Sequence, residues 1–375
     1  MLTFHSIWTK PAIAKGVDEI ALWDFEWLTW LASILHAKRF SQVVLVADAR
    51  GKAFVERLGL APFYDEILLG LDDIPSTIDP EIFWAAGKLF AIPLLRKSRK
   101  FEPCDEAVAS LDWDCIPWNY PEAPHDIMCL NLESLQWPWY RDCKAKYEKF
   151  VPSKVNWNLP PANNGIFHFS NYDHMREYAK LSTEFMTRFS RAAAEGNYFD
   201  LPRYVYGDAM TFAEQQLFPS AALQCKKLVE PFVHVRADGF LPANPFFTHL
   251  WTTKALYRAF PEARVHYTNQ LIRHLRLEFP ESKAVLEAQG LDVTQPVLTT
   301  EENTKWNQEG RKNFPSHNIG VVTSLSGTAV LRDRNICGTR PLNVGSVVLP
   351  GDRIICASSD TKIELEFNQT SEYPA

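Results

Sequence analysis

The first third of the chain alternates between apolar runs typical of strands and apolar stripes typical of helices. Strand-like runs lie at 2–8, 42–47 and 66–69. The run at 42–47 is rich in β-branched residues, as in a strand that is buried on both faces. Apolar residues at helical spacing predict helices over 24–36, 52–58 and 80–95. This alternation predicts a parallel, doubly wound sheet.

The middle of the chain continues the mixture of strands and helices. We expect strands over 107–118 and 165–169, and an irregular excursion over 137–161, which is rich in Trp, Pro and Asn. A long helix is expected over 173–194, with Asn171 or Asp173 as its N-cap. Further helices are expected over 211–223, 253–260 and 269–279.

The pattern changes in the last quarter of the chain. Residues 296–315 are polar and aperiodic, as in a linker, and from Gly320 onward short strands alternate with glycines. We therefore expect an α/β domain over 1–285, with a mixed or parallel sheet flanked by helices. A linker over 286–317 and a small all-β domain over 318–375 complete the predicted organisation.

Composition and charge exclude several classes of protein. The 375 residues are 46% hydrophobic and 22% charged, which excludes wholesale disorder, and the net charge of -6 gives no case for nucleic acid or an anionic membrane. The apolar run 19–35 contains Asp24 and Glu26, so no membrane span is expected, and no secretory signal opens the chain. Seven cysteines without a C-x-x-C pair indicate free thiols in a reducing cytoplasm.

Asp112-Trp-Asp114 is the sharpest chemical feature of the sequence. In a strand over 107–118, residues two apart point to the same face, so both carboxylates could hold one divalent cation. A solvated strand end is the alternative. The position of the pair at the end of an apolar strand of an α/β domain favours the metal site, because ligands bind at the carboxyl ends of such strands.

Three other segments could contribute to the same chemistry. His249 and Lys254 could supply a metal ligand and a phosphate-binding ammonium, although a local hydrogen bond and a solvated helix face are the simpler interpretation. Asn163 and Asn164 have amides suited to sugar hydroxyls, but Asn-Gly is also a turn signal. Glu214 is a candidate base or hydroxyl acceptor, whereas most such glutamates are surface charges.

Two further side chains have competing interpretations. Lys88 is a cation in an otherwise apolar helical stretch, where a snorkelling surface lysine is the default. Asp48 ends a strand, where ligands bind in such sheets, but it also precedes Gly51 as a turn-forming Asp would.

Together these segments resemble the GT-A-type, nucleotide-sugar-dependent glycosyltransferases, and in particular poorly characterised bacterial members. The likeness covers about residues 1–280. It rests on the motifs Val46–Asp48, Trp84–Lys88, Asp112–Asp114, Asn163–Gly165, Glu214–Gln215 and His249–Lys254.

The resemblance implies a GT-A-like fold and a role for each motif. It implies that Mn²⁺ or Mg²⁺ is held by Asp112, Asp114 and His249, with Lys254 on the donor diphosphate. It also places Ser6, Trp8 and Asp48 near the nucleoside of the donor and Asn163, Asn164 and Glu214 near the sugars, with Lys88 assisting the diphosphate.

The C-terminal part resembles a FecR-type β domain. The matching segments are 322–330, 344–354 and the alternating strand 361–367. Such domains bind other proteins or glycans, so the resemblance implies an accessory module with a protein or glycan partner.

The expected function is therefore transfer of a sugar from a nucleoside diphosphate, with a UDP-sugar as the favoured donor, to a glycan or small-molecule acceptor. Glu214 is the expected base if the reaction inverts the configuration of the sugar. The FecR-type tail favours a rival interpretation, a non-catalytic glycan- or protein-binding scaffold. A nucleotidyltransferase also pairs acids around a metal, but the sequence lacks the glycine-rich phosphate loop it would need.

Overall fold

The structure is a computed structural model. It describes residues 1–101, 107–122, 124–151, 155–195, 207–234, 246–251, 253–291, 302, 307, 310–311, 319–333, 339–350 and 352–367. The chain divides into two compact units. Unit 1 comprises Met1–Ala21 and Ser33–Asp238, and unit 2 comprises Leu22–Ala32 and Gly239–Ala375.

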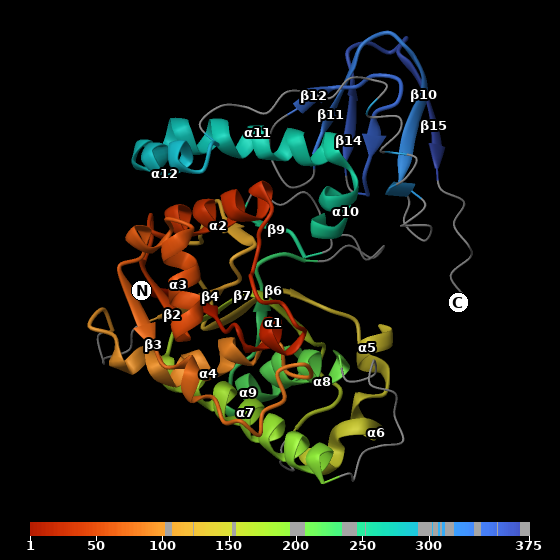
Figure 1. The fold of residues 1–375 in the computed structure, drawn as a ribbon. Helices are drawn as coiled ribbons and strands as arrows, with labels where there is room; N and C mark the ends of the chain where they lie inside the picture. Colours follow the sequence, from red (N-terminus) through yellow and green to blue (C-terminus); the bar gives the residue numbers. More distant parts are fainter. Residues whose placement is uncertain are drawn as a thin grey trace. The chain divides into compact units, whose positions relative to one another are not determined.

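Unit 1 is built on a seven-stranded sheet of order β3-β2-β1-β4-β7-β6-β8 (Figure 1). Its strands are β1 (Leu2–Ile7), β2 (Gln42–Ala47), β3 (Glu66–Leu69), β4 (Val108–Leu111), β6 (Ile127–Leu132), β7 (Ala162–Phe169) and β8 (Glu230–Pro231). Neighbouring strands are parallel except at β7, which is antiparallel to both β4 and β6. The predicted fold class, a mixed and mostly parallel sheet flanked by helices, is confirmed.

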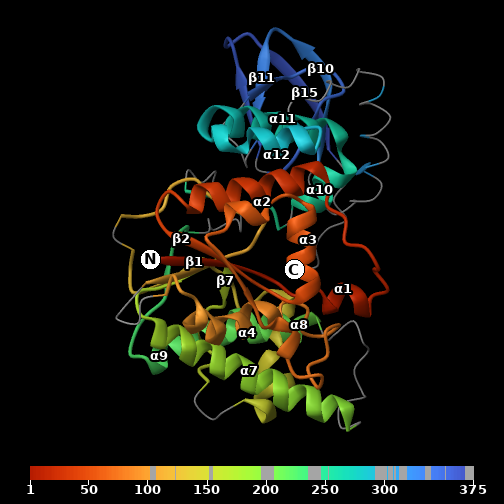
Figure 2. The ribbon, with the colours of Figure 1, turned by 60° about the vertical axis from the view of Figure 1, so that its left-hand side comes forward.

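Helices cover both faces of this sheet. The helices α4 (Ala86–Leu94), α7 (Tyr172–Ala194) and α9 (Leu217–Gln224) lie on one face, and α3 (Ala49–Arg57) lies on the other (Figures 1 and 2). Alternate residues of β1, Leu2 and Phe4, belong to the core shared with α4 and α7, whereas the buried His5, which follows Phe4, bonds Tyr64 and Ser33. Both faces are buried, as the continuous apolar run of β2 predicts.

The prediction of one continuous strand over 107–118 is wrong. β4 ends at Leu111, residues 112–114 form a turn closed by a bond from the Cys115 N–H to the Asp112 carbonyl, and β5 (Cys115–Pro117) follows. Asp side chains favour turns over strand interiors, which explains the break. Asp112 and Asp114 therefore share a turn and do not lie on one face of a strand.

The turn interpretation of Asn163-Asn-Gly165 is also wrong, because all three residues lie inside β7.

The side chain of Asn171 accepts a hydrogen bond from the Asp173 N–H, which identifies Asn171 as the N-cap of α7. The helix expected over 80–95 begins only at Ala86. The excursion over 137–161 contains the short helices α5 (Pro138–Arg141), α6 (Cys143–Tyr147) and η4 (Glu148–Phe150).

The helix expected over 211–223 is divided into three parts. They are α8 (Gly207–Thr211), the π-helix η6 (Phe212–Gln216) and α9. In η6 the Leu217 N–H reaches back five residues to the Phe212 carbonyl. Short π-helical segments of this kind occur frequently at functional sites.

Unit 2 combines helices with two small antiparallel sheets, of order β13-β10-β15 and β12-β11-β14. Its helices are α10 (Thr253–Ala259), α11 (Pro261–Glu278) and α12 (Lys283–Ala288). Its C-terminal strands are β10 (Gly320–Ser326), β11 (Ala329–Arg332), β12 (Thr339–Pro341), β13 (Val347–Val348), β14 (Arg353–Cys356) and β15 (Lys362–Phe367). The predicted small all-β region is confirmed, whereas most of the predicted linker 296–315 lies outside the described residues.

The helices and the β strands of unit 2 are joined by buried polar contacts. Glu262, in the first turn of α11, accepts bonds from the Arg340 guanidinium, from Ser346 Oγ at 3.0 Å and from the Val347 N–H at 3.0 Å. The Tyr257 hydroxyl donates to Asp333 Oδ2 at 2.8 Å. The predicted domain boundaries at 285 and 318 both fall within this unit.

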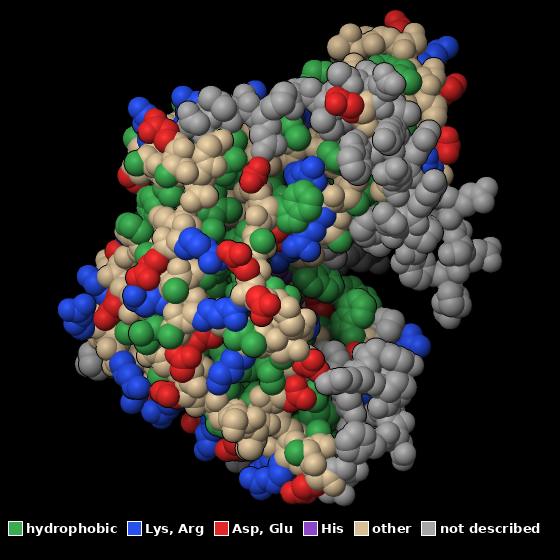
Figure 3. Space-filling view, in the orientation of Figure 1, with side chains coloured by type: hydrophobic (Ala, Val, Ile, Leu, Met, Phe, Trp, Pro, Cys, Tyr) green, Lys and Arg blue, Asp and Glu red, His purple; other side chains and the backbone are tan. Residues whose placement is uncertain are grey.

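Acidic and basic side chains are interspersed on the face of the molecule drawn in Figure 3. Pairs such as Lys38–Asp65 and Lys52–Glu56 lie close enough to interact on the surface. Among the described helices, none has both the length and the hydropathy needed to cross a membrane.

Candidate functional site

The candidate site of unit 1 begins where β4 ends. The Asp112 N–H still donates to the Gly165 carbonyl of β7 at 2.8 Å, and the chain then turns toward β5. Asp112 thus lies at the carboxyl end of a strand that is parallel to β1, the position at which open α/β sheets bind ligands. Asp112 is half-buried and Asp114 is buried.

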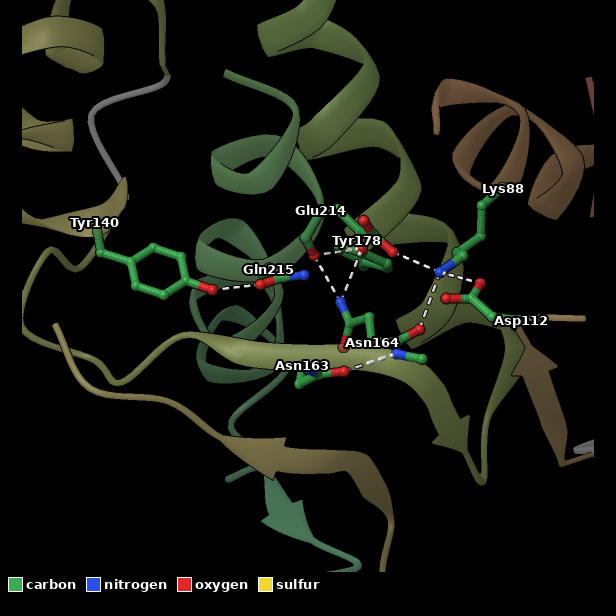
Figure 4. Close-up of polar contacts among 9 residues, drawn as sticks. Lys88, Asp112, Tyr140, Asn163, Asn164, Tyr178, Glu214 and Gln215 are labelled. Atoms are coloured by element: carbon green, nitrogen blue, oxygen red, sulfur yellow. Dashed lines mark hydrogen bonds and ion pairs between the residues drawn. The ribbon is translucent and has the colours of Figure 1, made fainter. Parts of the chain in front are cut away.

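The ammonium of Lys88, on α4, points toward Asp112, Glu214 and Asn164 (Figure 4). Its Nζ is 2.6 Å from Asp112 Oδ1 and 2.5 Å from Glu214 Oε1, and it donates to the Asn164 carbonyl at 2.9 Å. A lysine ammonium has three N–H donors, so all three are used within the protein. The snorkelling interpretation of Lys88 is wrong, since the side chain is only 6% exposed.

Burial and charge act against each other at this ion pair. Burial alone would lower the pKa of Lys88, but the carboxylates of Asp112 and Glu214 outweigh burial and raise this pKa above its ordinary value. Burial raises the pKa of Glu214, while Lys88 acts in the opposite direction. Each charge is therefore tolerated in the interior because the other is present.

The π-helix η6 exposes backbone carbonyls that side chains of β7 and α7 then bond. The Glu214 carbonyl accepts from Asn164 Nδ2 at 2.6 Å and from the Tyr178 hydroxyl at 2.6 Å, and the Ala213 carbonyl accepts from Ser182 Oγ at 2.7 Å. These bonds fix the backbone of Glu214. The Oδ1 atom of Asn164 is buried without a hydrogen-bond partner among the described residues.

A second buried polar chain starts at Asn163. Asn163 Nδ2 donates to Glu133 Oε1 at 2.9 Å, and the Tyr140 hydroxyl lies within bonding distance of both Glu133 Oε2 and Gln215 Oε1. One hydroxyl hydrogen cannot serve two acceptors, so a proton on Glu133 or a turned Gln215 amide must supply the second hydrogen. Burial raises the pKa of Glu133, which favours the proton.

Asp112 and Asp114 share one turn of unit 1, and their carboxylates lie close enough together to hold a metal ion. Carboxylates fit Mn²⁺ or Mg²⁺, which prefer oxygen ligands. His249 is the last residue of β9 (Phe247–His249) and belongs to unit 2, and its role as a third ligand stays a prediction. Lys254, the proposed phosphate contact, lies in the first turn of α10, and its role stays a prediction.

Asp48 is engaged within the fold. Its Oδ1 caps α3 by accepting from the Gly51 N–H at 2.6 Å, and its Oδ2 accepts from the N–H and the hydroxyl of Thr9 at 2.6 and 2.8 Å. This geometry supports the interpretation of Asp48 as a turn-forming residue. Its predicted place near the nucleoside is not tested by these contacts.

Ser6 lies near the end of β1, the strand that pairs with β4, and Trp8 follows the last residue of that strand. A Cβ on Gly87 would lie 2.6 Å from Trp8 Cβ, so the glycine of the Trp84–Lys88 motif allows α4 to approach this tryptophan closely. The buried Trp8 Nε1 has no hydrogen-bond partner among the described residues. A donor role for Ser6 and Trp8 stays a prediction.

Sequence reasoning missed three residues of the site: Glu133, Tyr140 and Tyr178. Tyr178 occupies a position in the apolar stripe of α7, so the sequence pattern does not indicate that its hydroxyl donates a hydrogen bond. Glu133 directly follows β6, a strand that the sequence analysis did not predict, and Tyr140 lies in the Trp- and Pro-rich segment 137–161, where no periodicity points to burial. The chain matches no protein-family model and no curated protein sequence.

Proposed function

We propose that the chain is a metal-dependent glycosyltransferase with a GT-A-like fold, transferring a sugar from a nucleoside diphosphate to a hydroxyl acceptor. The observation that carries this proposal is the buried Lys88, which holds Asp112 and Glu214 together at the carboxyl end of β4. Buried charges are costly, and a merely structural core could replace them with apolar residues at no loss of stability. Their position at a ligand-binding edge favours a chemical role.

In this proposal Asp112 and Asp114 would hold Mn²⁺ or Mg²⁺, and His249 is the further ligand that the resemblance implies. The metal supplies positive charge to the departing diphosphate, where negative charge develops during transfer. Lys88 and Lys254 add further positive charge, and Glu214 is the group that would accept the proton of the attacking hydroxyl. Asn164 and Tyr178 support this role because they fix the backbone of Glu214.

A second candidate is a non-catalytic binding protein with a nucleotide-sugar-like fold. The saturated contacts of Lys88 favour it, because each of its N–H donors already has an acceptor within unit 1. Such a protein would bind a nucleotide sugar without breaking it.

Thermal unfolding with a panel of nucleotides and nucleotide sugars, with and without Mn²⁺, tests the proposal. A ligand at a hundredfold over its Kd adds about 2.7 kcal/mol of stability if it binds only the folded state. We expect a Mn²⁺-dependent rise in Tm for one nucleoside diphosphate series, followed by release of the diphosphate on incubation. Binding without release would favour the second candidate, and no shift with any ligand would contradict both.

A further inference from the structure

The three contacts of Lys88 are not equivalent. The side chain of Glu214 is 6% exposed and the Asn164 carbonyl belongs to a sheet strand, so neither acceptor can move far. The side chain of Asp112 is 32% exposed and follows the end of β4. Asp112 is therefore the one partner of Lys88 that can turn away without disturbing the core.

Asp112 also has two possible binding partners, the Lys88 ammonium and a metal ion. Its Oδ1 lies 2.6 Å from Lys88 Nζ, and its carboxylate shares a turn with that of Asp114, with which it could hold a metal ion. A divalent cation bound by the Asp112 carboxylate would be brought close to the ammonium, where like charges repel. The lysine contact and the metal contact therefore oppose each other.

We propose that Lys88 and the divalent cation compete for Asp112, and that the cation's arrival frees one Lys88 N–H for an oxygen of a diphosphate ligand. This inference rests on the proposed function. It states how binding of the divalent cation and binding of the diphosphate depend on each other at the contact between Lys88 and Asp112. The cation alone binds weakly because Lys88 opposes it. The diphosphate alone binds weakly because the donor that it needs is occupied by Asp112.

Each ligand thus removes an obstacle to the other, which is thermodynamic coupling and must be reciprocal. A metal that merely bridges Asp112 to the diphosphate would also couple the two ligands. The two accounts differ in what removal of the lysine does to binding of the metal alone. Competition predicts tighter metal binding, whereas bridging predicts no change once the charge of the centre is held constant.

The double variant Lys88→Met/Glu214→Gln holds that charge constant. Lys88, Glu214, Asp112 and Asp114 sum formally to -2, and the double variant leaves Asp112 and Asp114, which also sum to -2. Long-range electrostatics are therefore matched, while the contact between Lys88 and Asp112 is lost. The single variant Glu214→Gln keeps that contact and is the control for the loss of the glutamate.

The experiment measures free Mn²⁺ by its electron paramagnetic resonance signal during titration of the full chain, with circular dichroism as the check of folding. The same titration at saturating Mn²⁺ uses methylenediphosphonate, a diphosphate that does not hydrolyse, as the anionic probe. Both readouts are binding constants and do not depend on activity.

We expect the double variant to bind Mn²⁺ alone about tenfold more tightly than wild type and the diphosphonate about tenfold more weakly, since a charge-assisted hydrogen bond is lost. Glu214→Gln is expected to weaken Mn²⁺ binding. Unchanged or weaker Mn²⁺ binding by the folded double variant overturns the competition while leaving the proposed function intact. No Mn²⁺ binding by wild type overturns the metal-dependent function and the competition with it.

Discussion

Lys88 Nζ and Glu214 Oε1 lie 2.5 Å apart in the interior of unit 1, with both side chains 6% exposed. The two residues are 126 positions apart in the sequence and reach each other from α4 and from the π-helix η6. This buried ion pair joins the two helical segments at the carboxyl end of β4.

Removal of one charge of the Lys88–Glu214 pair should lower the unfolding free energy of the protein. Lys88→Met leaves Glu214 as a buried carboxylate without its cation, and we expect unfolding free energy to fall by about 3–5 kcal/mol. Lys88→Met/Glu214→Gln removes both charges and should recover most of that loss. Denaturant unfolding of wild type and the two variants measures the difference. A double variant no more stable than Lys88→Met would contradict the pairing.

Glu133 should make stability depend on pH. Its folded-state pKa is raised by burial, so between its ordinary value and the raised value the unfolded chain loses a proton that the folded chain keeps. Stability should therefore fall as pH rises through this window. Glu133→Gln should flatten that fall, because an amide does not titrate in this range.

Unfolding in denaturant at a series of pH values from 5 to 8 tests this account of Glu133. Glu148→Gln is the matched control, because the Glu148 side chain is 64% exposed. An identical pH profile for wild type and Glu133→Gln would show that Glu133 holds no extra proton.

Asp48 should behave as a structural residue. Asp48→Ala removes the cap of α3 and both bonds to Thr9, so we expect a loss of about 2 kcal/mol or more. Asp48→Asn retains an acceptor for the Gly51 N–H and should lose less. Chemical denaturation measures both losses. If Asp48→Asn left stability unchanged but abolished binding of nucleotides, the donor role implied by the resemblance would be the better account.

Gly87 should not tolerate a side chain. A Cβ at this position would meet Trp8 Cβ at 2.6 Å, so Gly87→Ala should destabilise the protein by about 1–3 kcal/mol. An Ala in an unobstructed helix would instead stabilise it by about 1 kcal/mol. The sign of the change in Tm separates the two outcomes.

The elements that the sequence predicts well are those whose pattern is local. β2 has the predicted bounds because its β-branched run is bordered by polar residues, and the N-cap of α7 is Asn171, one of the two predicted candidates. The turn at Asp112 was missed because apolar residues on both sides of it gave one continuous run. The antiparallel direction of β7 has no local signal either, since it depends on the path of the whole connection.

The site was predictable only in part for the same reason. Asp112 and Lys88 were singled out as charges in an apolar setting and Glu214 as a candidate base, but their mutual contact depends on a tertiary arrangement of segments far apart in the chain. Glu133 and Tyr140 become a pair only because helix α5 brings the tyrosine back to the end of β6. No regular spacing of residues in the sequence predicts that the chain brings Tyr140 back to Glu133.

We propose that Asp112 serves a metal-dependent transfer reaction. The most direct test is Mn²⁺-dependent release of nucleoside diphosphate from a panel of nucleotide sugars, by wild type and by Asp112→Asn. Asp126→Asn is the control, because Asp126 also contacts a lysine, Lys227, but at an exposed position. We predict release by wild type and by the control, and a loss of about a hundredfold or more in Asp112→Asn. Full Mn²⁺-dependent release by Asp112→Asn would contradict the account.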